Sequence, residues 1–193
     1  ENPIDFLHKN KRGIICQREI GTDTMNYETA FGSLRHQSAD IVIVTGLETY
    51  EVVNRALNLA AGGTLVLATA TAVSCQVMLE KIIDLYPPHL NQAARSLLAV
   101  ALEAIIGQTL LTKASGDGLM PAFELLIGTS HVKSLLRENK LFQIQNLMST
   151  VGRDSGMQTQ EMALRFLVKK NLVTMEEAVR KAVRPEEFKK IMS

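Results

Sequence analysis

The side chains that most clearly point to chemistry lie on one predicted helix that follows a glycine turn. Val132, Leu135 and Leu136 have i, i+3, i+4 spacing, which gives this helix one apolar face for packing against its own domain. Lys133 and Arg137, four residues apart, then share an exposed stripe. An ordinary amphipathic helix with a solvated basic face is the structural alternative. We take the polar residues of this segment as a candidate partner-binding set: His131, Lys133, Ser134, Arg137 and Glu138.

The histidines, cysteines and carboxylates show no spacing typical of a metal site or a catalytic triad. None of the four histidines takes part in an H-x₃-H or H-E-x-x-H pattern, and no C-x-x-C occurs. We therefore expect no metal site built by the protein alone. Cys16 and Cys75 lie far apart in apolar surroundings, which predicts two buried, reduced thiols rather than a disulfide.

A phosphate-binding loop of the form G-x-x-x-x-G-K-[ST] does not occur in the sequence. The one close pair of glycines in a predicted loop, Gly116 and Gly118, is better explained by a hairpin turn. We therefore expect this chain alone not to bind ATP, and any phosphate loop to lie before Glu1. Because the chain begins with Glu1 rather than Met, we expect it to be part of a longer protein.

The first two thirds of the chain predict an α/β layer. Residues 40–45 and 64–69 are apolar, β-branched runs, as in strands buried on both faces of a parallel sheet. Residues 51–61 between them have helical spacing, which completes a β-α-β unit. The remaining predicted elements are helices at 73–85 and 90–105 and a hairpin of strands at 108–113 and 119–127.

After Thr129 the pattern predicts helices only, at 130–137, 140–150, 158–169, 174–182 and 185–191. Thr174 is a predicted N-cap, with Glu177 reaching back to it from three residues later. The sequence therefore predicts two parts, an α/β domain over 1–128 and a helical subdomain over 129–193.

Two segments carry a resemblance to a known family. Residues 124–138 read E-L-L-I-G-T-S-H-V-K-S-L-L-R-E, similar to the signature E-[IL]-L-I-G-T-x-A-I-R-N-L-I-R-E of the PilT/PilU family, hexameric ATPases that retract type IV pili. Residues 156–159 match that family's G-M-Q-T element, and nearly the whole chain can be laid along its C-terminal motor domain. The resemblance implies a RecA-like P-loop NTPase core with a mostly parallel sheet, incomplete in this chain, followed by a C-terminal helical subdomain.

The resemblance also implies ATP and Mg²⁺ as cofactors and names two residues near them. The opening E-N-P-I-D-F resembles the family's acidic box E-D-P-I-E-F. This chain keeps the glutamate as Glu1 and has Asn2 where the family has an aspartate. The sequence Q-R-E-I-G-T-D-T resembles Q-R-E-V-G-R-D-T and keeps Arg18, which would neutralise phosphate charge across a ring interface. Glu1 and Arg18 are therefore the predicted nucleotide-binding residues.

The positions where the family has its catalytic side chains hold residues that cannot perform that chemistry. In the ungapped match of residues 39–49 to P-D-V-I-L-V-G-E-M-R-D, Gly46 replaces the glutamate that activates the attacking water. In the L-A-T-L-H-T element, Thr71 replaces the histidine that senses the γ-phosphate. A repositioned Glu48 is the alternative general base. The only candidate catalytic residues are therefore Glu48 and Glu1, the glutamate of the acidic box.

The resemblance implies a subunit segment of a PilT/PilU-like hexameric retraction ATPase with impaired ATP hydrolysis. The alternative is a non-hydrolysing structural or regulatory paralogue in a pilus or type II secretion assembly. Either way, we expect a homo- or hetero-hexamer in the cytoplasm, peripheral at the inner-membrane base of the pilus machine, with the pilus platform or secretion machinery as partner. A net charge of +1 gives no reason to expect nucleic acid, and the longest apolar run, residues 97–106, is too short for membrane insertion.

Overall fold

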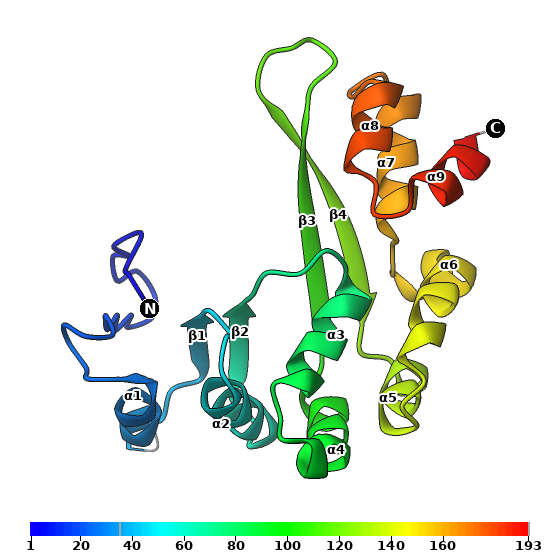
Figure 1. The fold of residues 1–193 in the computed structure, drawn as a ribbon. Helices are drawn as coiled ribbons and strands as arrows, with labels where there is room; N and C mark the ends of the chain where they lie inside the picture. Colours follow the sequence, from blue (N-terminus) through cyan, green and yellow to red (C-terminus); the bar gives the residue numbers. More distant parts are fainter. Residues whose placement is uncertain (35, 193) are drawn as a thin grey trace. The chain divides into compact units, whose positions relative to one another are not determined.

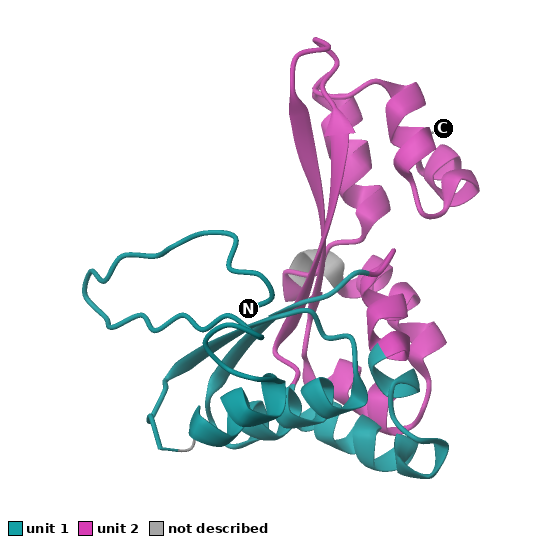
Figure 2. Cartoon of the chain, turned by 60° about the vertical axis from the view of Figure 1, so that its left-hand side comes forward, with its two compact units in different colours: residues 1–71, 82–101 teal, residues 72–81, 102–193 magenta. Residues whose placement is uncertain are grey.

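The computed structural model describes residues 1–34 and 36–192, without the side chains of 152–154, and the chain divides into two compact units (Figures 1 and 2). Unit 1 comprises residues 1–71 and 82–101, and unit 2 comprises residues 72–81 and 102–193. The division into these units reflects which residues of this chain contact one another. The boundary after residue 128, which separates a motor core from its helical subdomain, stays a prediction.

Unit 1 contains the predicted β-α-β unit. Strands β1 (Ile41–Thr45) and β2 (Leu65–Thr69) pair in parallel over their full length. Helix α2 (Tyr50–Ala61) connects them, and Thr49 is its N-cap, whose side chain accepts a hydrogen bond from the Val52 amide. Its apolar face covers one face of the sheet. The buried side chains of this core are Phe31, Val42, Val44, Val52 and Ala56.

Two helices of unit 1 differ from the sequence prediction. Helix α1 (Tyr27–Leu34) was not predicted, because it is short and has Gly32 in its interior. Helix α4 (Asn91–Ala101), preceded by the single 3₁₀ turn η1 (Pro88–Leu90), ends four residues before the predicted limit of 105. Residues from 104 onwards belong to a strand instead.

Unit 2 is built on the predicted antiparallel hairpin. Strands β3 (Ala104–Thr112) and β4 (Leu119–Ile127) pair along all nine positions, from Ala104 opposite Ile127 to Thr112 opposite Leu119. This pairing explains why β3 begins earlier than the predicted residue 108. Gly116 and Gly118 have positive φ angles in the connecting turn, as a tight hairpin loop requires.

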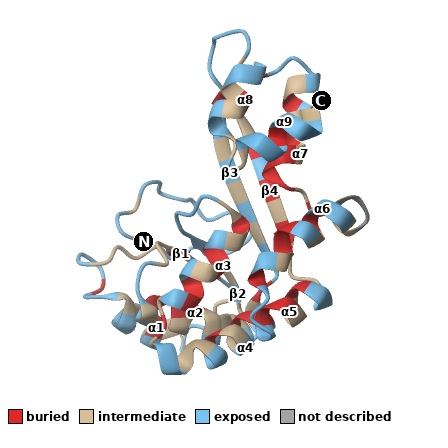
Figure 3. Ribbon diagram, turned by 45° about the vertical axis from the view of Figure 1, so that its right-hand side comes forward, coloured by how far each residue is buried: buried red, intermediate tan, exposed pale blue. Residues whose placement is uncertain are grey.

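The helices of unit 2 follow the predicted order, and several of them pack on the hairpin (Figures 1 and 3). Their buried core contains Leu111, Leu164 and Phe188, none of which is exposed. The capping prediction at Thr174 is half right, because Thr174 caps the Glu177 amide whereas the Glu177 carboxylate accepts from the Thr112 amide instead. The elements are α3 (Cys75–Asp84, ending in unit 1), α5 (Ser130–Arg137), η2 (Leu141–Gln143), α6 (Ile144–Ser155), α7 (Gln160–Lys169), α8 (Met175–Lys181) and α9 (Pro185–Met192).

Candidate functional site

The turn after β1 is held by hydrogen bonds from three other segments of unit 1. The Gly46 amide donates to Thr69 Oγ1 at 3.2 Å, and the Tyr27 hydroxyl donates to the Thr45 carbonyl at 2.6 Å. The Asn2 amide donates to Thr45 Oγ1 at 3.1 Å. The carboxyl ends of parallel strands are where α/β proteins bind ligands. These three hydrogen bonds therefore fix the backbone of a candidate site.

Gly46 adopts a φ angle of +82°, a conformation that side-chain-bearing residues rarely take. The Glu48 side chain folds back toward it: a Cβ added to Gly46 would lie 3.7 Å from both Cδ and Oε1 of Glu48. The carboxylate of Glu48 therefore lies beside the position from which a side chain at residue 46 would start. Glu48 is exposed, so its carboxylate has access to solvent and ligand.

The N-terminal segment brings Glu1 and Arg18 together. The Glu1 nitrogen donates to the Arg18 carbonyl at 2.9 Å, and Gln17 Nε2 donates to Glu1 Oε1 at 2.9 Å. The Arg18 guanidinium donates to Ser33 Oγ at 2.7 Å and borders an open cavity of about 380 Å³, which is also lined by Thr22 and Asp23. Arg18 is thus positioned at a polar cavity by helix α1.

Thr71, which we expect at the position of the family's γ-phosphate-sensing histidine, is exposed beyond the end of β2. The sequence reasoning missed Tyr27, Thr45 and Thr69, which hold the β1 turn. For Tyr27 a signal was present, because Tyr27 and Phe31 have the i, i+4 spacing of a buried helical face and a tyrosine on such a face needs a partner for its hydroxyl.

Several residues of the segment 124–138 in unit 2 have a structural role. A Cβ added to Gly128 would lie 2.2 Å from the Leu102 carbonyl oxygen, so only glycine permits this approach of the two backbones. Thr129 is the N-cap of α5, because its side chain accepts from the Val132 amide. Val132, Leu135 and Leu136 are buried, which confirms the predicted apolar face.

The outward face of α5 is only partly as predicted. Arg137 is exposed, whereas Lys133 has 22% of its side-chain surface exposed and pairs with Glu103 at 3.3 Å. The prediction that Lys133 is exposed was therefore wrong, because Glu103 at the start of the hairpin holds its ammonium group. His131 and Glu138 are exposed, and the Lys140 hydrogen bond keeps the pKa of Glu138 below its usual value.

The G-M-Q-T element lies against β4. Gly156 ends α6 in the left-handed conformation at φ +73°, and Met157 is buried. The Gln158 backbone pairs with Leu125 by two hydrogen bonds of 2.8 and 3.0 Å, and Thr159 caps α7. The two segments that carry the family resemblance are therefore paired to each other in the fold.

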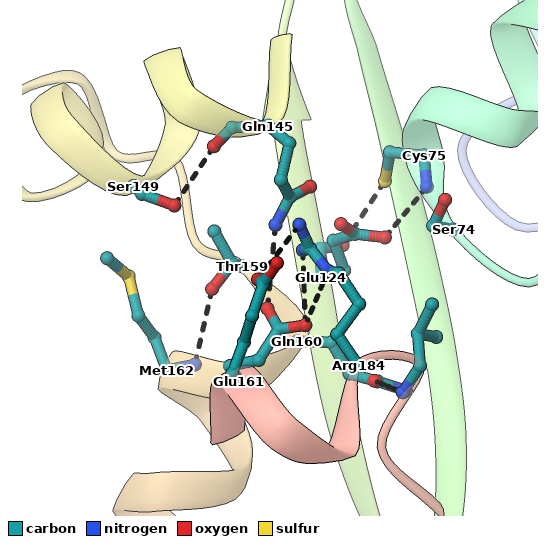
Figure 4. A network of polar contacts seen from close by, with 12 residues as sticks. Ser74, Cys75, Glu124, Gln145, Ser149, Thr159, Gln160, Glu161, Met162 and Arg184 are labelled. Atoms are coloured by element: carbon teal, nitrogen blue, oxygen red, sulfur yellow. Dashed lines mark hydrogen bonds and ion pairs between the residues drawn. The ribbon is translucent and has the colours of Figure 1, made fainter. Parts of the chain in front are cut away.

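Unit 2 also contains a buried polar network that sequence reasoning missed (Figure 4). Glu161 on α7 is 2% exposed and accepts hydrogen bonds from Arg184 at 3.1 Å and from Gln145 at 3.5 Å. Glu124 on β4 is also buried, and its carboxylate accepts from the Cys75 amide at 2.7 Å. The network joins β4, α3, α6, α7 and the residue before α9.

Burial raises the pKa of two groups in this network, Glu124 and Cys75. Burial raises the pKa of Glu124, which the hydrogen bonds from Cys75 oppose. Burial and the neighbouring Glu124 carboxylate raise the pKa of the Cys75 thiol to about 12, so this thiol is not a nucleophile at neutral pH. The prediction of two buried cysteines was half right, because Cys75 is buried and Cys16 is exposed.

The described residues, 1–34 and 36–192, contain no group of three or more His, Cys, Asp or Glu side chains that could hold a metal ion. Within that same part of the chain, none of the helices has the length and apolar character needed to cross a membrane.

The chain is similar in sequence to several pilus and twitching motility proteins. No protein-family model matches the chain. It is 36% identical over 188 residues to the type IV pilus retraction ATPase PilT of Pseudomonas aeruginosa, which covers 97% of this chain and 54% of PilT. It is 34% identical over 186 residues to a twitching motility protein of Neisseria gonorrhoeae, covering 96% of this chain and 50% of that protein. The chain thus spans about half the length of these relatives.

Solved structures give the same result. A crystal structure of the pilus retraction motor PilT with bound ADP matches with a TM-score of 0.89 at 33% identity, covering 98% of this chain and 53% of that chain. The ATPase DotB of Yersinia pseudotuberculosis matches with a TM-score of 0.81 at 20% identity, covering 93% of this chain and 47% of that chain, which shows the fold alone. The predicted fold class is therefore confirmed.

Proposed function

This chain is homologous to the C-terminal half of the PilT- and PilU-type ATPases, and from that premise we propose that it is the corresponding segment of a motor that retracts type IV pili. The observation that carries the proposal is the match to PilT along 97% of the chain. In this proposal the motor is a hexamer in the cytoplasm, docked peripherally at the inner-membrane base of the pilus. A non-hydrolysing paralogue in a pilus or type II secretion assembly is the alternative.

ATP and Mg²⁺ are proposed cofactors of the whole protein. Arg18 fits a role toward phosphate, because its guanidinium borders a polar cavity and carries a permanent positive charge. Glu1, whose amino nitrogen donates to the Arg18 carbonyl, is the second residue that would hold Mg-ATP. When bound, Mg-ATP would supply the phosphoryl group that is transferred to water. We expect residues 1–193 alone not to bind Mg-ATP in the micromolar range, which calorimetric titration checks.

We propose that ATP hydrolysis is impaired in the whole protein. Gly46 has no side chain to activate water, and the Thr71 hydroxyl is neither a base nor a cation at neutral pH. The folded-back position of Glu48 favours a second candidate, an active motor in which Glu48 is the general base. The two candidates predict opposite effects of removing the Glu48 carboxylate.

ATPase rates of the whole protein separate these candidates. Under impaired hydrolysis, the double change Gly46→Glu with Thr71→His raises the rate on the order of 10²- to 10⁴-fold, and Glu48→Gln changes nothing. Gly46→Ala is the control, since it brings the strain of a side chain at φ +82° without a carboxylate. If Glu48→Gln abolishes turnover while the exposed Glu51→Gln does not, Glu48 is the base.

The outward face of α5 is the proposed partner surface, with His131, Lys133, Ser134, Arg137 and Glu138 as its residues. Reversing the charges of Lys133 and Arg137 should abolish pilus-dependent motility while the protein stays folded. Motility that persists in cells carrying this folded variant would remove α5 from the function.

A further inference from the structure

The loop of residues 6–15 in unit 1 combines exposed apolar side chains with basic ones. All ten of its residues are exposed, and Ile14 reaches 92% exposure. Residues 6–18 include Lys and Arg but no acidic residue, although the chain as a whole has a net charge of only +1. The apolar side chains are Phe6, Leu7, Ile14 and Ile15, and the basic ones between them are Lys9, Lys11 and Arg12.

Hydrogen bonds close this loop at its base. Gln17 Oε1 accepts from the His8 amide at 2.7 Å, and Gln17 Nε2 donates to the Phe6 carbonyl at 2.9 Å. Nearer the tip, Asn10 Oδ1 accepts from the Ile15 amide at 2.7 Å. The loop therefore has a defined conformation in which its apolar side chains are exposed. Its backbone extends away from the helices of unit 1 (Figure 2).

We propose that the loop of residues 6–15 docks on an anionic phospholipid surface. Phe6, Leu7, Ile14 and Ile15 would enter the boundary between headgroups and acyl chains, while the basic side chains bind lipid phosphates. The long stems of lysine and arginine allow both at once. Nucleic acid would use the charges but leave Ile14 in water, so the joint presence of both side-chain types favours lipid. The docking needs neither nucleotide nor pilus.

A tryptophan reporter tests the insertion. The chain has no tryptophan, so Phe6→Trp provides a single fluorophore in the loop of the whole protein, in a background from which any tryptophans outside this chain are removed. Its emission should shift to the blue with vesicles of phosphatidylcholine and phosphatidylglycerol, and not with phosphatidylcholine alone. Phe142→Trp is the matched control, because Phe142 is 68% exposed and Phe6 69%. An equal shift of both reporters, or of neither, overturns the proposal.

Charge variants test the contact with phosphate in vesicle co-sedimentation. Changing Lys9, Lys11 and Arg12 together to Gln should lower binding to the anionic vesicles roughly 100-fold. Changing the exposed Lys169, Lys170 and Lys181 to Gln should leave it unchanged. Equal loss in both triples would reduce the effect to overall charge and overturn the proposal. If the unmodified protein does not sediment with anionic vesicles, the proposal is overturned. If, in addition, the Lys9, Lys11 and Arg12 variant loses subunit assembly, the loop makes a protein contact instead.

Discussion

The turn after β1 in unit 1 and the 124–138 segment in unit 2 both resemble the same family, but their residues do different things. In unit 2, Gly128 permits a close backbone approach, Thr129 caps a helix and Glu124 lies in a buried network. In unit 1, Gly46 and Thr71 lie outside the buried core, and we propose that they stand where the family has its catalytic side chains. The match in unit 2 therefore bears mainly on the fold, whereas the proposal about chemistry rests on unit 1.

The largest stability effect that would break this comparison is expected at Gly128. Gly128→Ala places a Cβ against the Leu102 carbonyl oxygen, so the backbone has to move, and we expect a loss of about 3 kcal/mol or more. Urea unfolding measures it. In unit 1, Gly32→Ala meets no atom within 4 Å in helix α1 and should instead stabilise by about 1 kcal/mol. Equal effects at both sites would mean that Gly128 has no special structural role.

The next largest effect is expected at the buried ion pair. Arg184→Met leaves the Glu161 carboxylate buried without its guanidinium, which should cost about 2 kcal/mol. Arg180→Met is the control, because Arg180 pairs with Glu177 while 66% of its own side chain is exposed, and it should cost at most about 0.5 kcal/mol. If the two variants unfold at the same urea concentration, the network does not stabilise unit 2.

A smaller effect concerns Glu124 and pH. Its folded-state pKa is raised, so the folded protein binds a proton more tightly than the unfolded chain does. The contribution of Glu124 to stability is therefore complete below the ordinary carboxyl pKa and is lost as pH rises through the raised value. Glu124→Gln should flatten the fall in stability above pH 4.5, and the exposed Glu176→Gln should not. Parallel pH profiles for the Glu124 variant and the unmodified protein would contradict this.

The sequence predicted the helices, strands and turns better than it predicted contacts between residues far apart in the chain. The β-α-β unit and the hairpin followed from the spacing of apolar residues and from Gly116 and Gly118, which act locally. The start of β3 at Ala104 did not, because it depends on pairing with Ile127, 23 residues away. The Glu161–Arg184 pair could not be predicted from the sequence either, since neither residue has a local pattern that marks it as buried.

The smallest effect separates the two basic residues of α5. Lys133 is held by Glu103, whereas Arg137 is exposed, so a double-mutant cycle of Lys133→Gln with Glu103→Gln should give a coupling of about 0.2–1 kcal/mol. Arg137→Gln should change stability by less than that. If α5 is a partner surface, Arg137→Gln alone should reduce motility more than Lys133→Gln, because the Lys133 ammonium is already engaged within unit 2. The reverse order would place the partner contact at Lys133, with the Glu103 pair opening on binding.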